Sequence, residues 1–306
     1  MPGLTGKDQV LTDYANKLAT LDAPKGRSLT QDALRRLAKN KAAVASIAIV
    51  LLIVLVAFIG PYLLPWGYSQ VDWSNIRKPP NFDNGHFLGT DQNGRDMAAR
   101  VLQGTQMSVI VAVVASFVSV TIGVIYGAVA GYFGGRVDAI MMRIVDVMYA
   151  LPYILFVIIL MVMFGRNPVL LFVGIGCIEW LTMARIVRGQ TLSIKEKEFI
   201  EAARASGAKP FTIIMRHIVP NLTGPVVIYA TLTIPEIIIA ESFLSYLGLG
   251  VQEPQTSLGT LISAGAPVAE VLPWMLLGPA AVLITLLLCL TYIGDGLRDA
   301  LDPKDR

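Results

Sequence analysis

The chain has 306 residues, of which 54% are hydrophobic and only 15% charged, with a mean hydropathy of +0.61. A soluble domain usually carries about 25% charged residues, so the composition excludes an ordinary soluble protein and a disordered chain. The net charge of +3, without a basic patch interleaved with aromatic residues, argues against nucleic-acid binding. Two cysteines, Cys177 and Cys289, and two histidines, His86 and His217, form no metal-binding pattern. We therefore expect no catalytic, cofactor-binding or metal-ligating residues in this chain.

Six segments are long and apolar enough to cross a bilayer, which takes about 20 mainly apolar residues. Forty-one mostly polar residues precede the first segment, which favours an uncleaved anchor over a signal peptide. Gly127 and Gly131 have the spacing that permits close helix approach. The sequence predicts an all-α polytopic membrane protein with six transmembrane helices, at Ala42–Leu64, Met107–Phe133, Ala139–Phe164, Val169–Met183, Pro225–Leu247 and Trp274–Ile293.

Basic residues are distributed unevenly between the two sides of the membrane. With six spans both termini share one side, and that side holds 20 of the 25 Lys and Arg residues. The excess of positive charge predicts that both termini are cytoplasmic. The resulting organisation is a cytoplasmic tail (1–41), a first transmembrane helix (42–64), an outer loop (65–106), a core of five transmembrane helices (107–293) with a cytoplasmic loop at 184–220, and a cytoplasmic C-terminal tail (294–306).

The last part of the N-terminal tail, Ser28–Lys41, has the pattern of a short basic amphipathic helix. Its apolar residues fall at helical spacing beside four basic side chains, and they are Leu29, Ala33, Leu34 and Leu37. Such a helix binds at the surface of a membrane that contains anionic lipid. We expect this membrane contact, and contact with a specific partner protein is the alternative.

The outer loop contains a cluster of turn-forming residues between Gly89 and Asp96. Asp91 and Asn93 are typical of turns in which a side chain bonds the backbone two residues on. Asp96 stands where an N-cap for the second transmembrane helix is needed. The loop thus predicts a structured entry into that helix.

The cytoplasmic loop predicts two short helices joined by a tight turn. Ser193–Glu196 has the form of a capping box, and a helical stretch follows it up to Ser206. Gly207 suits the left-handed position that ends a helix. Pro210 suits the first position of a second helix, which continues to Ile218.

The first of these helices carries charged residues at spacings that allow ion pairs. Lys197 and Glu201 are four residues apart, and Glu201 and Arg204 are three apart. Ala202 and Ala203 leave a small, flat surface on which another chain can pack. From these residues alone, a docking surface and a plain connector between spans remain equally open.

Acidic residues inside a predicted span are candidates for function. Glu236 and Glu241 lie in the fifth segment, where Pro235 predicts a kink. We predict that they line the substrate path, where a carboxylate can meet a peptide amine. The alternative is a glutamate that faces a partner subunit or is satisfied by hydrogen bonds.

Other charges near the cytoplasmic ends of the spans favour structural pairing. Arg143 and Asp146 are three residues apart on one helix, which predicts an ion pair. Glu179 is expected to pair with Arg185 or Arg188. Neither pair is predicted to contact a ligand.

The cytoplasmic loop resembles the EAA loop of ABC-importer permeases. Glu201–Ala203, Gly207 and Pro220 occur at the spacing of that family motif. His217 and Val219 replace the isoleucine and leucine that the motif usually has before its proline. These two departures affect only the packing of the second helix.

Further motifs resemble the dipeptide and oligopeptide branch of these permeases, and the C subunits of oligopeptide importers in particular. Together they cover nearly the whole chain. Nickel and glutathione permeases are relatives within the same branch. The matching segments are Arg27–Ser46, Gly89–Asp96, Glu241–Gly250 and Gly294–Pro303.

The resemblance implies a type I permease fold in a bacterial inner membrane, with the outer loop in the periplasm. It implies a pore formed with a second permease subunit, two ATP-binding subunits that hold ATP and Mg, and a periplasmic or lipid-anchored peptide-binding protein. The implied coupling residues are Glu201, which pairs with a basic group of the ATPase, Ala202 and Ala203, which permit close approach, Gly207, which sets the turn, and Pro220. The implied substrates are oligopeptides, with dipeptides, glutathione or nickel as alternatives.

Two other functional classes fit a polytopic chain. A secondary transporter usually shows inverted repeats and paired broken helices, and the sequence has no convincing internal repeat. An intramembrane enzyme needs a nucleophile with a base or a metal set, and no such motif is present. The chain also lacks a P-loop, so an ATP-driven process requires a partner.

Overall fold

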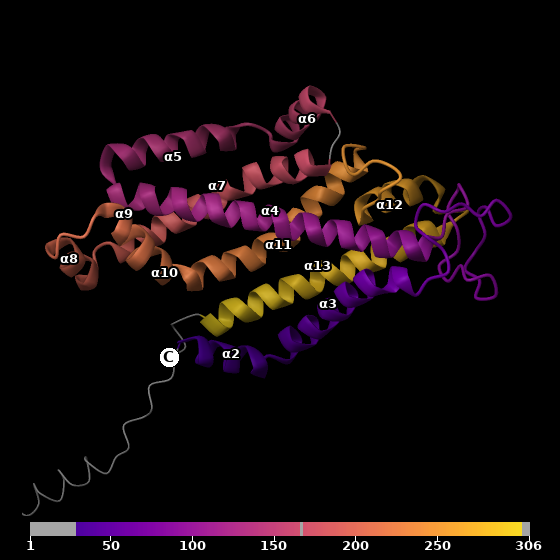
Figure 1. Cartoon of the computed structure of the whole chain (residues 1–306), viewed down its shortest axis with the longest axis horizontal. Coiled ribbons are helices and arrows are strands. Elements are labelled where there is room, and N and C mark those ends of the chain that lie inside the picture. Colours follow the sequence, from indigo (N-terminus) through magenta and orange to yellow (C-terminus); the bar gives the residue numbers. More distant parts are fainter. Residues whose placement is uncertain (1–28, 166–167, 302–306) are drawn as a thin grey trace, which may run out of the picture.

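The computed structural model describes residues 29–165 and 168–301 (Figure 1). Over these ranges the secondary structure is helical, apart from isolated bridges in the outer loop such as Val71–Arg95, so the all-α prediction is confirmed. The predicted tail segments 1–28 and 302–306 lie outside the described residues. The longer helices are α2 (Leu29–Lys39), α3 (Lys41–Ile59), α4 (Met97–Phe133), α5 (Gly135–Ala150), α6 (Tyr153–Phe164), α7 (Pro168–Ile194), α11 (Thr223–Tyr246) and α13 (Pro273–Leu301).

Four of the described helices, α3, α4, α11 and α13, are long and apolar enough to cross a membrane, and α5 with α6 can form a fifth span. The straight helix predicted for Ala139–Phe164 is wrong, because α5 and α6 meet at a bend of 82°. Pro152 causes this break: it lacks an N–H and forces the preceding Leu151 into an extended conformation. The predicted fourth span, Val169–Met183, lies within α7. This helix is not among those that are long and apolar enough to cross a membrane. The count of six spans therefore stays a prediction.

The long helices form a bundle with loops at its two ends (Figure 1). α3 and α13 run side by side along one flank of α4, and α5 lies along the other flank with α7. The outer loop is at one end, and the short helices α8 (Glu198–Ala205), α9 (Pro210–Ile213) and α10 (Val219–Asn221) are at the opposite end. The main core joins five helices through buried residues such as Val111 of α4, Val157 of α6, Ile175 of α7, Ile237 of α11 and Leu286 of α13.

α4 and α7 make the most extensive helix contact, and glycines make it possible. Gly123, Gly127 and Gly131 lie one turn apart on α4 and face the backbone of α7. A Cβ at Gly131 would stand 2.8 Å from the carbonyl oxygen of Arg188, closer than real Cβ atoms approach. The predicted close helix approach at Gly127 and Gly131 is confirmed. These glycines join the last third of α4 to α7, the helix that leads into the loop at 184–220.

The amphipathic helix predicted before the first span is confirmed as α2. Ala33 is buried, and Leu37 packs near Gly296 of α13. Leu34 and Arg35 are exposed on the face of α2 that points away from the bundle. Asn40 separates α2 from α3 and caps α3 by accepting a hydrogen bond from the Ala43 amide at 3.2 Å. α2 thus packs on the bundle and keeps an exposed basic and apolar face.

Candidate functional site

The first helix of the cytoplasmic loop is α8 (Glu198–Ala205), and it begins later than the capping box predicted. α7 continues through Ser193 to Ile194, and the Lys195 amide still donates to the Thr191 carbonyl at 2.9 Å. The predicted box at Ser193–Glu196 is therefore wrong, because Ser193 belongs to the preceding helix. Lys197 precedes α8 and provides no side-chain cap.

Gly207 ends α8 in the predicted left-handed conformation, with φ +79°. Its amide donates to the Arg204 carbonyl at 2.9 Å, and the Ala208 amide donates to the Ala203 carbonyl at 3.1 Å. This pair of bonds is a Schellman motif, which satisfies the last carbonyls of a helix. The prediction of a glycine turn is confirmed.

Replacing Gly207 with alanine is expected to strain the turn without creating a clash. A Cβ there would meet no atom within 4 Å, so the cost comes from the left-handed backbone alone, about 1–2 kcal/mol. The free energy of unfolding should fall by this amount, and Gly207→Asn should lose less stability than Gly207→Ala because asparagine tolerates this conformation better. Thermal unfolding measures both variants, and an equal loss would contradict this role of the turn.

The second helix begins at Pro210, as predicted, but it is not a regular α-helix up to Ile218. α9 (Pro210–Ile213) passes into one π-helical turn, η2 (Ile214–Ile218), and then into α10 (Val219–Asn221). Pro220 gives the physical reason: its ring crowds the carbonyl four residues earlier, and a wider turn relieves this contact. The chain then enters α11 at Thr223.

A group of buried aliphatic side chains anchors these short helices to the bundle. They pack against Val124 of α4 and against Met183 and Val187 of α7. The Arg204 guanidinium lies 5.2 Å from the ring centre of Tyr132, which connects α8 to the end of α4. The loop is therefore a packed extension of α4 and α7. The anchoring residues are Ile200, Ile213, Ile214, Ile218 and Leu222.

The loop surface opposite this anchor carries the predicted motif residues. Glu201 and Ala202 are exposed, and Ala203 is half-buried. Within the described residues Glu201 has no ion pair, so the predicted pairs with Lys197 and Arg204 are not formed. The carboxylate of Glu201 remains available to a basic group of another chain.

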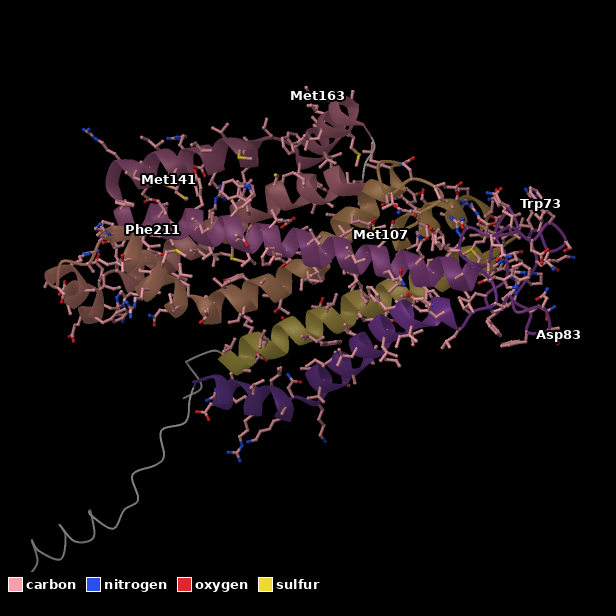
Figure 2. The ribbon with its side chains drawn as sticks, viewed as in Figure 1. Trp73, Asp83, Met107, Met141, Met163 and Phe211 are labelled. Carbon is pink, nitrogen blue, oxygen red and sulfur yellow. The ribbon has the colours of Figure 1, made fainter. Side chains whose placement is uncertain are left out.

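Sequence reasoning missed three apolar residues of this loop surface. Phe211 is 70% exposed, Phe199 43% and Met215 42%. Figure 2 shows Phe211 at the end of the molecule opposite Trp73 and Asp83 of the outer loop. Exposed apolar side chains on a loop are typical of a protein contact, and Phe199 among charged neighbours was the available signal. We define the coupling surface as Phe199, Glu201, Ala202, Phe211 and Met215.

Ion pairs between helices hold α5 against α7. Arg188 of α7 donates from Nε to Asp138 of α5 at 2.9 Å, and Arg185 donates to Asp146 at 2.8 Å. The predicted pair of Arg143 with Asp146 is therefore wrong. The packing of α7 on α5 places Arg185 within hydrogen-bond distance of Asp146. Arg185 therefore pairs with Asp146 in place of Arg143.

The predicted partner of Glu179 is also wrong, since both candidate arginines bind acids of α5. Glu179 is half-buried on α7 and lies within electrostatic range of Glu236 on α11, which is exposed. These two acidic side chains belong to adjacent helices of the bundle. Glu236 therefore stands on a surface that a substrate or a partner subunit can reach.

Glu241 has a different environment from Glu236, although both lie on α11. It is fully buried, and it accepts hydrogen bonds from Ser108 of α4 at 3.0 Å and from Ser245 at 2.6 Å. The Leu258 amide at the start of α12 (Leu258–Gly265) donates to the same Ser108 hydroxyl at 3.3 Å. Glu241 thus connects three helices through serine hydroxyls.

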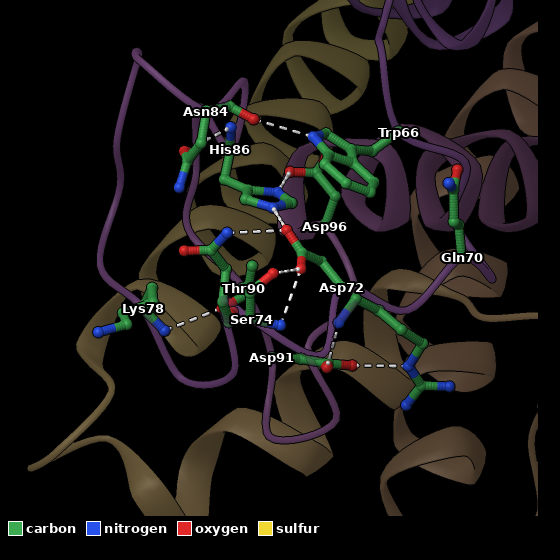
Figure 3. A network of polar contacts seen from close by, with 12 residues as sticks. Trp66, Gln70, Asp72, Ser74, Lys78, Asn84, His86, Thr90, Asp91 and Asp96 are labelled. Carbon is green, nitrogen blue, oxygen red and sulfur yellow. Dashed lines mark hydrogen bonds and ion pairs between the residues drawn. The ribbon is translucent and has the colours of Figure 1, made fainter.

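The outer loop is held by a histidine between two carboxylates (Figure 3). His86 Nδ1 lies 2.9 Å from Asp96, and its Nε2 lies 3.4 Å from Asp72. The indole of Trp66 stacks on the imidazole with 4.8 Å between ring centres. Asp96 also accepts from the Ala99 amide at 2.7 Å, so the predicted cap of the second transmembrane helix is confirmed.

A second cluster of charges joins this loop to the segment after α11. Asp91 accepts from the Asn93 amide at 2.8 Å, which confirms the predicted turn, and from Arg95 Nε at 2.8 Å. Arg95 Nη2 donates to Glu253 at 2.7 Å, and this bond lowers the pKa of Glu253. Arg100 lies beside both acids. We define Asp91, Arg95, Arg100 and Glu253 as the outer arginine cluster.

Comparison with known proteins identifies the chain over nearly its full length. Residues 119–306 match the family model for the binding-protein-dependent transport system inner membrane component, and residues 28–80 match the N-terminal TM domain of oligopeptide transport permease C. The oligopeptide transport system permease protein OppC of Haemophilus influenzae is 50% identical over 92% of this chain and 90% of its own. OppC of Escherichia coli K12 is 50% identical over 97% of both chains. The dipeptide permease protein DppC of Bacillus subtilis is 44% identical over 97% of this chain and 92% of its own.

The fold is similar to that of a solved transporter. A chain of the inward-facing MetNI methionine ABC transporter superposes with a TM-score of 0.55 at 20% identity, covering 67% of this chain and 98% of that one. Its low identity makes this a likeness of fold. The family models and relatives carry the assignment further: the chain belongs to the family of binding-protein-dependent transport system inner membrane components and is a multi-pass bacterial inner-membrane permease.

Proposed function

We propose that the chain is one of two permease subunits that form the pore of an ATP-driven oligopeptide importer. Support comes from two relatives, each 50% identical over at least nine-tenths of both chains, that are named as oligopeptide permeases. The match of residues 28–80 to the N-terminal domain of oligopeptide transport permease C points the same way. A dipeptide permease at 44% identity keeps dipeptides as the alternative substrate, and glutathione and nickel permeases belong to the same branch.

The observation that carries this proposal is the exposed Glu201 on a helix anchored to the bundle. α8 is tied to α4 and α7 by the buried Ile200 and by the contact of Arg204 with Tyr132. A displacement applied at the coupling surface is thereby transmitted to the two helices with the closest contact. Docking of a partner ATPase there biases the permease between inward-open and outward-open states.

The partners follow from the same proposal. One of two ATP-binding subunits docks on the coupling surface, and the two subunits hold ATP and Mg, since this chain carries no P-loop. A second permease subunit completes the pore, and a peptide-binding protein delivers the substrate at the outer side. The chain itself acts without a cofactor and is not an enzyme.

The substrate path is proposed to pass Glu236 rather than Glu241. Glu236 is exposed on α11 beside Glu179, whereas Glu241 is enclosed by serines inside this chain. A carboxylate on the path can pair with the ammonium group of a peptide. The second permease subunit supplies the facing wall.

The test uses membrane vesicles that contain the complete transporter, with Glu201→Ala compared with Glu198→Ala. Both residues are exposed glutamates of α8, so Glu198→Ala controls for loss of charge on this helix. Removing one partner of an interfacial charge pair costs about 2–5 kcal/mol, so Glu201→Ala should weaken ATPase binding at least about thirtyfold and abolish ATP-driven uptake. Glu198→Ala should retain uptake. Uptake that persists without ATP and is unchanged by Glu201→Ala would favour a secondary transporter instead.

A further inference from the structure

A pocket of about 260 Å³ lies at the outer end of the molecule, where the outer loop meets α4, α12 and α13. The outer arginine cluster supplies the charged part of its lining. The rest consists of Gln92 and Asn93 together with the apolar side chains of Met97, Leu261, Ala264 and Met275. The pocket therefore offers cationic groups and an apolar surface to the same occupant.

Arg100 is the buried cation of this pocket, with a side chain only 6% exposed. Its Nη1 lies 3.1 Å from Asp91 Oδ2, and its Nη2 lies 3.7 Å from Glu253 Oε1. Nη1 contacts Asp91 as an ion pair without hydrogen-bond geometry, and Nε has no hydrogen-bond partner in the part of the chain that the structure describes. A buried donor without an acceptor costs free energy, and a guanidinium suits a planar carboxylate. Arg100 is thus prepared for an acceptor from outside this chain.

The two acids of the cluster are held differently. The Asp91 side chain is 5% exposed and accepts from backbone amides of its own turn. The Glu253 side chain is 64% exposed, and its polar contacts within the described chain are with the two guanidinium groups. Turning Glu253 outward leaves one excess positive charge at the pocket. That charge matches a single carboxylate.

We propose that this pocket receives the C-terminal residue of an incoming peptide, and that Glu253 takes the place of its carboxylate while the pocket is empty. The peptide carboxylate pairs with Arg95 and Arg100, and the side chain of the last residue packs against Met97 and Leu261. A C-terminal residue carries its carboxylate and its side chain on one carbon atom, so it satisfies both parts of the lining at once. An acidic side chain of a docking protein carries no apolar side chain on the carbon atom next to its carboxylate. The inference rests on the proposed function, since the ligand is a peptide.

The test measures binding of N-acetyl-L-leucine and its C-terminal amide to the full chain in lipid nanodiscs by saturation-transfer NMR. Glu253→Gln removes the internal competitor, and Glu270→Gln is the matched control, an exposed glutamate of the segment between α12 and α13. Removing a competitor that fills the site about nine-tenths of the time raises the apparent affinity about tenfold. We expect this gain for the acid with Glu253→Gln, and no gain for the amide or with Glu270→Gln.

Three results would overturn the inference. One is an unchanged affinity of Glu253→Gln for the acid, and another is an equal gain for acid and amide. The third is a Glu253→Gln chain that gains affinity for the purified peptide-binding protein instead of the free acid. ATP-driven peptide uptake by the wild-type transporter, measured in parallel, tests the proposed function separately, because uptake can persist when the pocket does not bind the acid.

Discussion

Replacing Gly127 with alanine is expected to lower the free energy of unfolding by about 2–3 kcal/mol, the upper range for overpacking a tight core. The new Cβ would stand 2.9 Å from both the Arg188 amide nitrogen and Val187 Cβ, and closer still to the Ala184 carbonyl oxygen. Two of these atoms belong to the backbone of α7, so no side-chain rotation relieves the contact. Thermal unfolding of the purified chain in detergent, followed by size-exclusion chromatography, measures the change.

Gly189→Ala is the control for this substitution, and the expected change has the opposite sign. Gly189 also lies in a helix, on α7, but a Cβ there would meet no atom within 4 Å. Alanine favours a helix over glycine by about 1 kcal/mol, so Gly189→Ala should raise stability slightly. A similar loss with both variants would show that glycine flexibility, rather than close packing, matters at Gly127.

Local chemistry explains which parts of the fold could be predicted from the sequence. Gly207, Pro210 and Asp96 act through their own backbone or an adjacent amide, so their roles were readable from the neighbouring residues. A proline such as Pro152 can mark a bend, but the size of the break depends on how α5 and α6 pack. The prediction of a capping box at Ser193 was wrong because α7 continues past this residue to Ile194.

The ion pairs could not be predicted because they connect residues far apart in the sequence. Asp146 pairs with Arg185 across two helices, although Arg143 lies one turn away on the same helix. Spacing along one helix identifies possible partners, but helix packing selects among all partners within reach. Helix packing also explains why Glu236 is exposed and Glu241 is buried. Both are acids in one apolar segment, and the packing of neighbouring helices buries only Glu241.

The coupling surface shows how far the motif and the structure each contribute. The motif predicts a role for Glu201, but it says nothing of Phe199 and Phe211, whose side chains are also exposed on this loop. Exposure depends on the complete fold and is not visible in a spacing pattern.

Glu241→Ala is expected to destabilise the chain by about 2–6 kcal/mol, because two buried serine hydroxyls lose their acceptor at about 1–3 kcal/mol each. The substitution leaves a cavity and removes the acceptor of Ser108 and Ser245, which connect α4 and α12 to α11. Thermal unfolding measures the loss, and Glu236→Ala on the same helix should change stability by less than about 0.5 kcal/mol because Glu236 is exposed.

Glu241→Gln separates a structural role from a role in transport. Glutamine keeps the shape and the hydrogen-bonding capacity of this position, since one serine hydroxyl can turn to accept from the amide. We therefore expect nearly normal stability and peptide uptake with Glu241→Gln, in contrast to Glu241→Ala. A stable Glu241→Gln chain that has lost uptake would contradict the structural role, and it would return Glu241 to the substrate path.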